Sequence, residues 1–172
     1  MKGRQVIISG HWVYDIVKVA SLLESKGWHI LPTFVIGNVK EEQKEWMVSL
    51  TAQQFDQKMG NQDFLLAAVN NWKAYGWTKY VDVDRDNVIV VPTMLRVAYE
   101  NLLREKGCEN ITTIFLEVDR NDADEIMEQQ GVTISHRDKI EREYATISFR
   151  WEYDYIFSES PEKVTKFINN IN

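Results

Sequence analysis

The sequence predicts an α/β protein with three layers, in which helices cover both faces of a mostly parallel central sheet. Short apolar runs rich in β-branched residues alternate along the chain with segments whose apolar residues recur at helical spacing. Asn87–Val91 (NVIVV) is almost continuously apolar, as expected of a strand that is buried on both faces. Strands that alternate with helices favour parallel pairing through crossover connections.

In the first half of the chain, the expected elements alternate regularly. Gln5–Ser9 (QVIIS) is typical of a short buried strand, and Asp15–Lys26 is typical of an amphipathic helix. Trp28–Phe34 (WHILPTF) predicts a second strand with a Pro near its end. A helix is expected over Ala52–Met59, because a Thr in front can cap it and a Gly behind can stop it. Asp63–Val69 (DFLLAAV) fits either a strand or a short helix.

The second half of the chain continues this alternation. Thr93–Lys106 has apolar residues at helical spacing and is followed by a Gly, so it predicts a helix. Ile111–Val118 and Tyr153–Phe157 are expected strands. A last helix is expected from Ser160, with Ser as its cap and Pro in its first turn. Between the strands expected at Ile111–Val118 and Tyr153–Phe157 lie two polar segments with helical patterns, Asp122–Gln130 and Ile134–Thr146.

Composition excludes several classes of protein. The chain has 172 residues, of which 44% are hydrophobic, and it fits one globular domain. Its net charge of −6 argues against DNA, RNA or an anionic membrane as a partner. The single cysteine, Cys108, can form neither an internal disulfide nor a cysteine-based metal cluster. Because the apolar runs are too short to cross a bilayer, we expect a soluble cytoplasmic protein.

The turn after the first strand has the frame of a phosphate-binding loop without its chemistry. Such loops follow the pattern G-x-x-x-x-G-K-[ST], in which bare amide groups and a lysine hold phosphates. Counted from Gly10, the position of the second glycine is occupied by Asp15. Ile16 and Val17 occupy the positions of the lysine and the hydroxyl residue, and Lys18 lies two residues too late to replace that lysine directly. The positions between carry mostly bulky side chains where small ones would let a phosphate approach, namely His11, Trp12, Val13 and Tyr14.

Longer segments of the chain follow a recognisable serial order. LTAQQFDQKMGNQDFLLAAVNNWKAYGWTKY (Leu50–Tyr80) combines a helix, an apolar segment and a Tyr-Gly turn. NVIVVPTMLRVAYENL (Asn87–Leu102) joins a buried strand to a helix, and EYDYIF (Glu152–Phe157) is a closing strand. Together with the altered loop, this order resembles guanylate kinases and their catalytically inactive relatives, the guanylate kinase-like domains of scaffold proteins.

The resemblance also implies how the chain is divided. It implies a single guanylate kinase-like domain over residues 1–172. The core would comprise 1–33 and 81–172, the subdomain that resembles a nucleoside monophosphate (NMP) site would comprise 34–80, and a lid-like helical segment would comprise 120–146.

Most functional positions that the resemblance implies are altered. The strand Asp that the family associates with its metal corresponds to Pro92, and the Glu that contacts guanine corresponds to Leu66. The arginines that grip the monophosphate would fall within 32–40, where Lys40 is the only cation. The resemblance therefore implies the fold of a kinase without most of its charged groups.

Other positions keep groups that could hold a ligand. Tyr75, Gly76 and Thr78 match the former NMP site, where two hydroxyls could contact a phosphate oxygen or a base edge. Three cations of the lid-like segment could approach an anion, namely Arg137, Lys139 and Arg142. In the plainer interpretation, Tyr75 is an aromatic residue packed at a turn and Thr78 is a strand residue without a ligand. The three cations then belong to a solvated helix face of mixed charge.

Three of the six tryptophans fall near the positions of the former nucleotide cleft. Trp12 lies in the altered loop, and Trp72 and Trp77 flank the Tyr75 turn, which in the family faces the cleft. If they converge, they would line an aromatic groove that clamps a planar base or anchors a partner protein. Alternatively, they fill the vacated cleft.

No metal site is expected. Asp82, Asp84 and Asp86 have the spacing of a calcium loop, but the positions that require Gly and Glu are occupied by Asn87 and Thr93. The three histidines share no metal-ligand spacing.

Three functions remain open from the sequence. The first is an inactive guanylate kinase-like protein, or pseudokinase, that binds a partner protein and has no catalytic residues and no cofactor. The second is a protein that binds a nucleotide or nucleotide-like small molecule without phosphoryl transfer, and the third is an atypical NMP kinase. The first is favoured because the phosphate, metal and arginine positions are lost together, and phosphoryl transfer depends on positioning and electrostatics.

Overall fold

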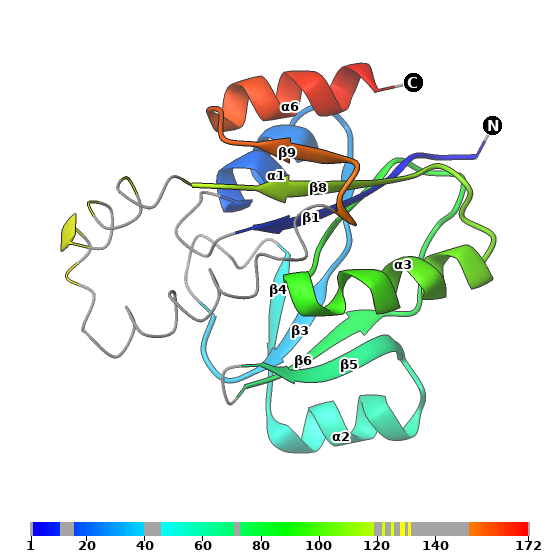
Figure 1. The fold of residues 1–172 in the computed structure, drawn as a ribbon. Helices are drawn as coiled ribbons and strands as arrows, with labels where there is room; N and C mark the ends of the chain where they lie inside the picture. Colours follow the sequence, from blue (N-terminus) through cyan, green and yellow to red (C-terminus); the bar gives the residue numbers. More distant parts are fainter. Residues whose placement is uncertain are drawn as a thin grey trace.

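The computed structural model describes most of the chain as two sheets with helices packed against them (Figure 1). The described residues are 2–10, 16–39, 46–70, 73–118 and 152–171, with Asp122, Glu125, Glu128, Gln129 and Gly131. Ile134–Thr146 lies outside them, and only isolated residues of Asp122–Gln130 are described. Among the described residues, no helix is long and apolar enough to cross a membrane.

The first sheet is parallel throughout and has the strand order β2-β7-β1-β8-β9. Its strands are β1 (Gln5–Gly10), β2 (His29–Ile30), β7 (Asn87–Val90), β8 (Ile111–Leu116) and β9 (Tyr155–Phe157). Ile7 in β1, Ile89 in β7 and Ile114 in β8 are completely buried. The predicted strand buried on both faces near residues 87–91 is therefore confirmed.

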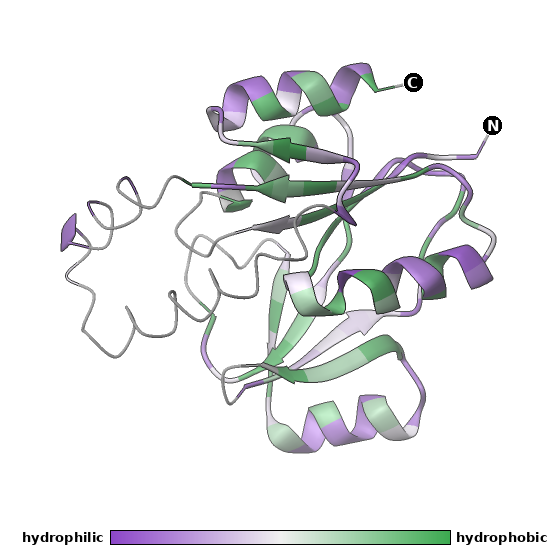
Figure 2. Cartoon of the chain, in the orientation of Figure 1, coloured by the Kyte–Doolittle hydropathy of each residue, from purple (hydrophilic) through white to green (hydrophobic). Residues whose placement is uncertain are grey.

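Helices cover both faces of this sheet, which confirms the predicted three-layer arrangement (Figure 1). The helical elements are α1 (Ile16–Glu24), a 3₁₀ turn η2 (Thr93–Leu95), α3 (Arg96–Glu105) and α6 (Pro161–Asn170). Val6 and Ile8 of β1 join the apolar cluster that contains α1 and α6, whereas Ile7 joins the cluster that contains α3. This alternation follows the period of two of a strand, and Figure 2 shows apolar residues concentrated in the strands and on the helix faces turned toward them.

The second sheet has the strand order β4-β3-β6-β5, and α2 packs beside it. Its elements are β3 (Thr33–Ile36), β4 (Met47–Leu50), α2 (Ala52–Gly60), β5 (Phe64–Asn70) and β6 (Lys73–Thr78). The expected cap of α2 is present: Thr51 Oγ1 accepts the Gln54 N–H, and the Gln54 side chain accepts the Thr51 N–H. The reciprocal bonds form a capping box, which satisfies two amide groups.

Two expectations are corrected by the second sheet. Trp28–Phe34 is not one strand, because the chain leaves the first sheet after β2 and enters β3 of the second sheet. The N–H of Leu31 still binds the Val88 carbonyl, but the N–H of Thr33 binds the Trp46 carbonyl. The apolar pattern could not reveal this change of partner. The expected Tyr75 turn is likewise wrong, because Tyr75 lies within strand β6.

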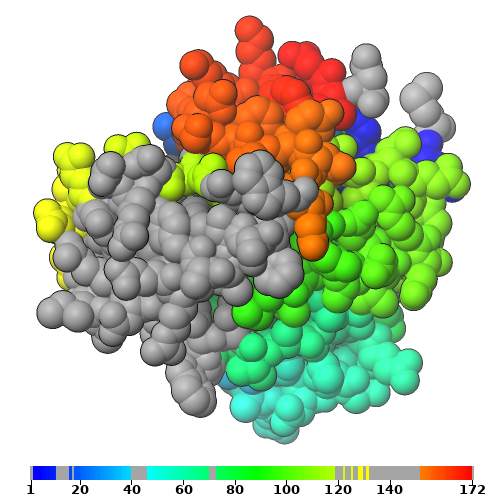
Figure 3. Space-filling model, viewed as in Figure 1, coloured from blue at the N-terminus to red at the C-terminus, as the bar shows by residue number. Residues whose placement is uncertain are grey.

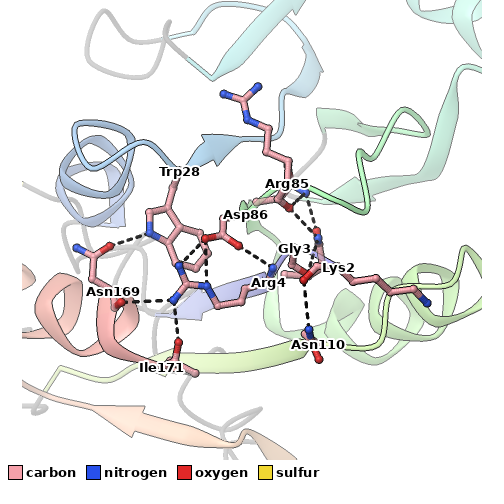
Figure 4. Close-up of polar contacts among 11 residues, drawn as sticks. Lys2, Gly3, Arg4, Trp28, Arg85, Asp86, Asn110, Asn169 and Ile171 are labelled. Atoms are coloured by element: carbon pink, nitrogen blue, oxygen red, sulfur yellow. Dashed lines mark hydrogen bonds and ion pairs between the residues drawn. The ribbon is translucent and has the colours of Figure 1, made fainter.

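Arg4 joins the start of the chain to its C-terminal helix (Figure 4). Its guanidinium binds the Asp86 carboxylate and donates to the Ile171 carbonyl at 2.7 Å. The same group lies over the Trp28 ring, 4.5 Å from its centroid, and the Trp28 indole donates to Asn169 Oδ1 at 2.8 Å. One cation therefore holds together β1, the start of β7 and the end of α6.

We expect Asp86→Asn to destabilise the protein at neutral pH and to have little effect in acid. Hydrogen bonds from Arg4 lower the pKa of Asp86 below the ordinary value of an aspartate side chain. A carboxyl group whose pKa is lower in the folded state stabilises the protein at pH values above its unfolded-state pKa. This stabilisation is lost as the pH falls through the folded-state pKa. Urea unfolding of both proteins from pH 7 to pH 3 measures the effect. A stability difference that stays constant over that range would contradict it.

Candidate functional site

The carboxyl end of β1 lies where a phosphate-binding loop would begin. Gly10 is the last residue of β1 and pairs with Leu116 of β8. A Cβ at Gly10 would lie 2.6 Å from the Leu116 carbonyl oxygen and 2.9 Å from the Leu116 Cβ, so close packing of two strands requires glycine here. The remaining residues predicted for the altered loop, His11, Trp12, Tyr14 and Asp15, lie outside the described residues.

The first residue of α1 stands at the lysine position of the loop pattern. This residue is Ile16, and its partly buried side chain packs against the apolar cluster beneath α1 and α6. Lys18, the third residue of α1, forms an ion pair with Glu162 of α6 at 2.9 Å. Lys18 is thus directed toward the C-terminal helix.

A buried arginine near the carboxyl ends of β1 and β7 was not expected from the sequence. Arg96, the first residue of α3, donates to Glu100 at 2.7 Å and to Glu152 at 2.9 Å. Its guanidinium lies 5.0 Å from the centre of the Tyr153 ring, and burial raises the pKa of Tyr153. The i,i+4 spacing of Arg96 and Glu100 was the available signal. Because two carboxylates flank it, this arginine offers little charge to an anionic ligand.

The predicted NMP-site residues lie together on strand β6, but they are largely engaged. Tyr75 is half-buried, its ring stacks on Trp77 with centroids 6.3 Å apart, and burial raises its pKa. Thr78 is 5% exposed, and its Oγ1 accepts the N–H of Tyr80. Pro92, at the position of the family's metal-associated Asp, directly precedes the turn η2.

Gly76 is explained by packing. Its backbone lies beneath the Phe64 ring, and a Cβ would lie 2.7 Å from three atoms of that ring. Phe64 in turn contacts Phe34 and Phe55, with ring centroids 5.6 Å and 4.9 Å away. This aromatic cluster fills the space between the second sheet and α2.

Trp77 is 1% exposed, so its side chain is unavailable to a partner. Its indole Nε1 donates to the Val90 carbonyl at 2.9 Å, and its ring meets Tyr99 of α3 edge-on. Leu66, at the position of the family's guanine-contacting Glu, pairs with Trp77 across the strands and packs against the same cluster. The side of the second sheet that faces the core is therefore occupied by apolar residues.

The remaining predicted site residues can be placed briefly. Trp72 and the lid cations Arg137, Lys139 and Arg142 lie outside the described residues. Among the residues that the structure describes, no group of three or more His, Cys, Asp or Glu side chains could hold a metal ion. Cys108 is a buried free thiol, and burial raises its pKa.

Comparisons with known proteins define the fold. No family model and no curated protein sequence matches the chain. Among solved structures, the crystal structure of guanylate kinase from Anaplasma phagocytophilum matches with a TM-score of 0.73 and 16% sequence identity. The match covers 98% of this chain and 84% of that chain. The chain therefore has a guanylate kinase-like fold, and at this level of identity the likeness shows the fold alone.

We expect Gly76→Ala to destabilise the protein by about 1–3 kcal/mol, because the added methyl group overlaps the Phe64 ring. In an uncrowded strand, replacing Gly would instead favour the strand. Urea unfolding measures the change, and Phe64→Leu provides the matched background because it removes the ring. If Gly76→Ala costs as much with Leu at this position as with Phe, the packing explanation is wrong.

Proposed function

We propose that this guanylate kinase-like chain does not transfer phosphoryl groups and acts by binding a partner protein. The observation that carries the proposal is the burial of Trp77 between the two sheets. Leu66, Tyr75 and Thr78, the positions that correspond to the family's NMP site, lie in the same two strands and are partly or fully buried. An apolar filling leaves little room there for a charged, hydrogen-bonding nucleotide.

The charges available near the first helix support the same proposal. Phosphoryl transfer needs cations and amide groups that are positioned around the transferred phosphate. Ile16 stands where the loop lysine would be and packs on the core, while Lys18 binds Glu162. Arg96 is held by Glu100 and Glu152. Ile16 carries no charge, and the two cations, Lys18 and Arg96, are already paired with carboxylates.

A second function, nucleotide binding without transfer, is favoured by one observation. Tyr75 is only half-buried, so its hydroxyl could reach a ligand at the margin of the second sheet. The lid cations Arg137, Lys139 and Arg142 would then supply charge for a phosphate. This alternative and the atypical kinase can both be separated from the first proposal by experiment.

Trp12 and Trp72 are the proposed anchors for the partner. Trp72 is one of the two residues between β5 and β6, and Val69, three residues before it in the sequence, is 73% exposed. Tryptophan is enriched among the residues that dominate the energetics of protein interfaces. Trp77, which the sequence also suggested as an anchor, is not proposed as one because its side chain is buried.

We expect no phosphoryl transfer from ATP to GMP, dGMP or dTMP, and no binding of these nucleotides by calorimetry with magnesium present. A coupled assay of ATP consumption measures turnover, and Tyr75→Phe, purified identically, is the control for a contaminating kinase. Turnover or binding that is present in the wild type and lost in Tyr75→Phe would contradict the proposal. Binding without turnover would favour the alternative of a nucleotide-binding protein.

We expect Trp72→Ala to weaken binding of the partner by at least about tenfold, as for an aromatic residue at the centre of an interface. The partner would be captured from an extract of the source organism, purified, and titrated against each variant. Tyr80→Ala is the matched control, because Tyr80 is an aromatic residue with 68% exposure beyond the other end of β6. Equal affinities of wild type and Trp72→Ala would exclude Trp72 as an anchor.

A further inference from the structure

The two sheets meet where the chain crosses from β2 into β3. β2 pairs with β7 at only two positions, His29 with Asn87 and Ile30 with Val88. The N–H of Leu31 then donates to the Val88 carbonyl at 2.9 Å. The first sheet therefore loses its edge strand while β7 still continues to Val90.

The end of β2 leaves one carbonyl of β7 without its regular strand partner. Backbone groups of a strand point alternately to its two neighbours, so the Val90 carbonyl points to the same side as that of Val88. The next donor of a continued β2 would be the Thr33 N–H, but this group binds the Trp46 carbonyl in the second sheet. The indole Nε1 of Trp77 takes its place and donates to the Val90 carbonyl at 2.9 Å.

This hydrogen bond is part-buried, and its donor belongs to an apolar cluster. Trp77 is 1% exposed, and Ile89, Tyr99 and Leu103 of the same cluster are completely buried. The Trp77 and Tyr99 rings meet edge-on with centroids 6.4 Å apart, which joins the second sheet to α3. Breaking the bond would leave the part-buried Val90 carbonyl without this donor, and an unpaired polar group is costly where water is excluded.

A second tryptophan lies on the opposite face of the first sheet. Trp46 directly precedes β4, is 5% exposed, and belongs to the cluster that contains Ile30, Val88 and α1. Its indole Nε1 is buried and has no hydrogen-bond partner among the described residues. Trp46 and Trp77 thus join the second sheet to opposite faces of the first, but only Trp77 does so with a hydrogen bond. In Figure 3, the green surface of α3 adjoins the teal surface of the segment that contains α2 and β5.

We infer that the bond from Trp77 to Val90 locks the second sheet against the first, so that the two sheets open and unfold as one unit. Trp77 acts as a substitute for the missing edge-strand residue and fixes the angle between the sheets. A protein locked in this way cannot close one subdomain over a ligand, as mobile-lid enzymes do. It can present a rigid surface, whatever molecule that surface binds.

Hydrogen exchange of the wild-type protein tests the lock first. We expect the most protected amides of β3, β5 and β6 to exchange as slowly as those of β1 and β8, because opening the second sheet requires global unfolding. If the second sheet exchanges independently and much faster than the first in the wild type, the inference is overturned without any variant.

Two matched variants then isolate the hydrogen bond. Trp77→Phe and Trp46→Phe each remove a buried indole N–H between the sheets, but only the first breaks a bond. We expect Trp77→Phe to speed exchange in β3, β5 and β6 by about tenfold or more while β1 and β8 stay slow. Trp46→Phe should leave the exchange rates of β3, β5 and β6, relative to those of β1 and β8, as they are in the wild type.

The outcomes separate the lock from general packing. Equal effects of Trp77→Phe and Trp46→Phe would show that ring packing, and not the bond to Val90, joins the sheets. Unchanged exchange in Trp77→Phe would also overturn the inference. If Trp77→Phe does not fold, the wild-type comparison of the two sheets still decides it.

Discussion

The arrangement of the described chain depends on one buried contact, the indole of Trp77 between the two sheets. The first sheet loses its edge strand at Leu31-Pro32, and the free carbonyl of Val90 needs a donor. Trp77 supplies that donor and at the same time fills the core-facing side of β5 and β6. A single side chain therefore supplies a donor to the Val90 carbonyl and fills part of the apolar core.

The sequence predicted the layers and many of the elements, because apolar periodicity marks each element locally. It predicted the strand buried near Asn87–Val91, the cap at Thr51 and the three layers. It could not predict that β2 and β3 belong to different sheets, since Trp28–Phe34 is apolar throughout and the change lies in which carbonyl Thr33 binds. The family resemblance implied a turn at Tyr75-Gly76, whereas both residues lie within β6 and Gly76 makes room for the Phe64 ring.

The sequence predicted which of the family's functional residues are replaced at the candidate site, but it did not predict the contacts of the side chains that stand there. Missing groups can be read from residue types, so Ile16 and Pro92 already argued against phosphate and metal chemistry. The burial of Trp77 could not be read in this way, because an aromatic residue near a cleft can equally anchor a partner or fill the space. Arg96 shows the same limit: its charge is visible in the sequence, but its two carboxylate partners, Glu100 and Glu152, converge only in the fold. Within this guanylate kinase-like fold, Arg96 is paired with two carboxylates and Ile16 packs against the apolar core.

The most direct test of the central claim is the hydrogen exchange of the Trp77 indole N–H, followed by NMR with and without magnesium, ATP and GMP. The account predicts a slowly exchanging resonance whose position and exchange rate do not change when the nucleotides are added. An indole that exchanges as fast as one exposed to water, or that shifts and exchanges faster with nucleotide, would show that this side chain opens to admit a ligand and would contradict the account.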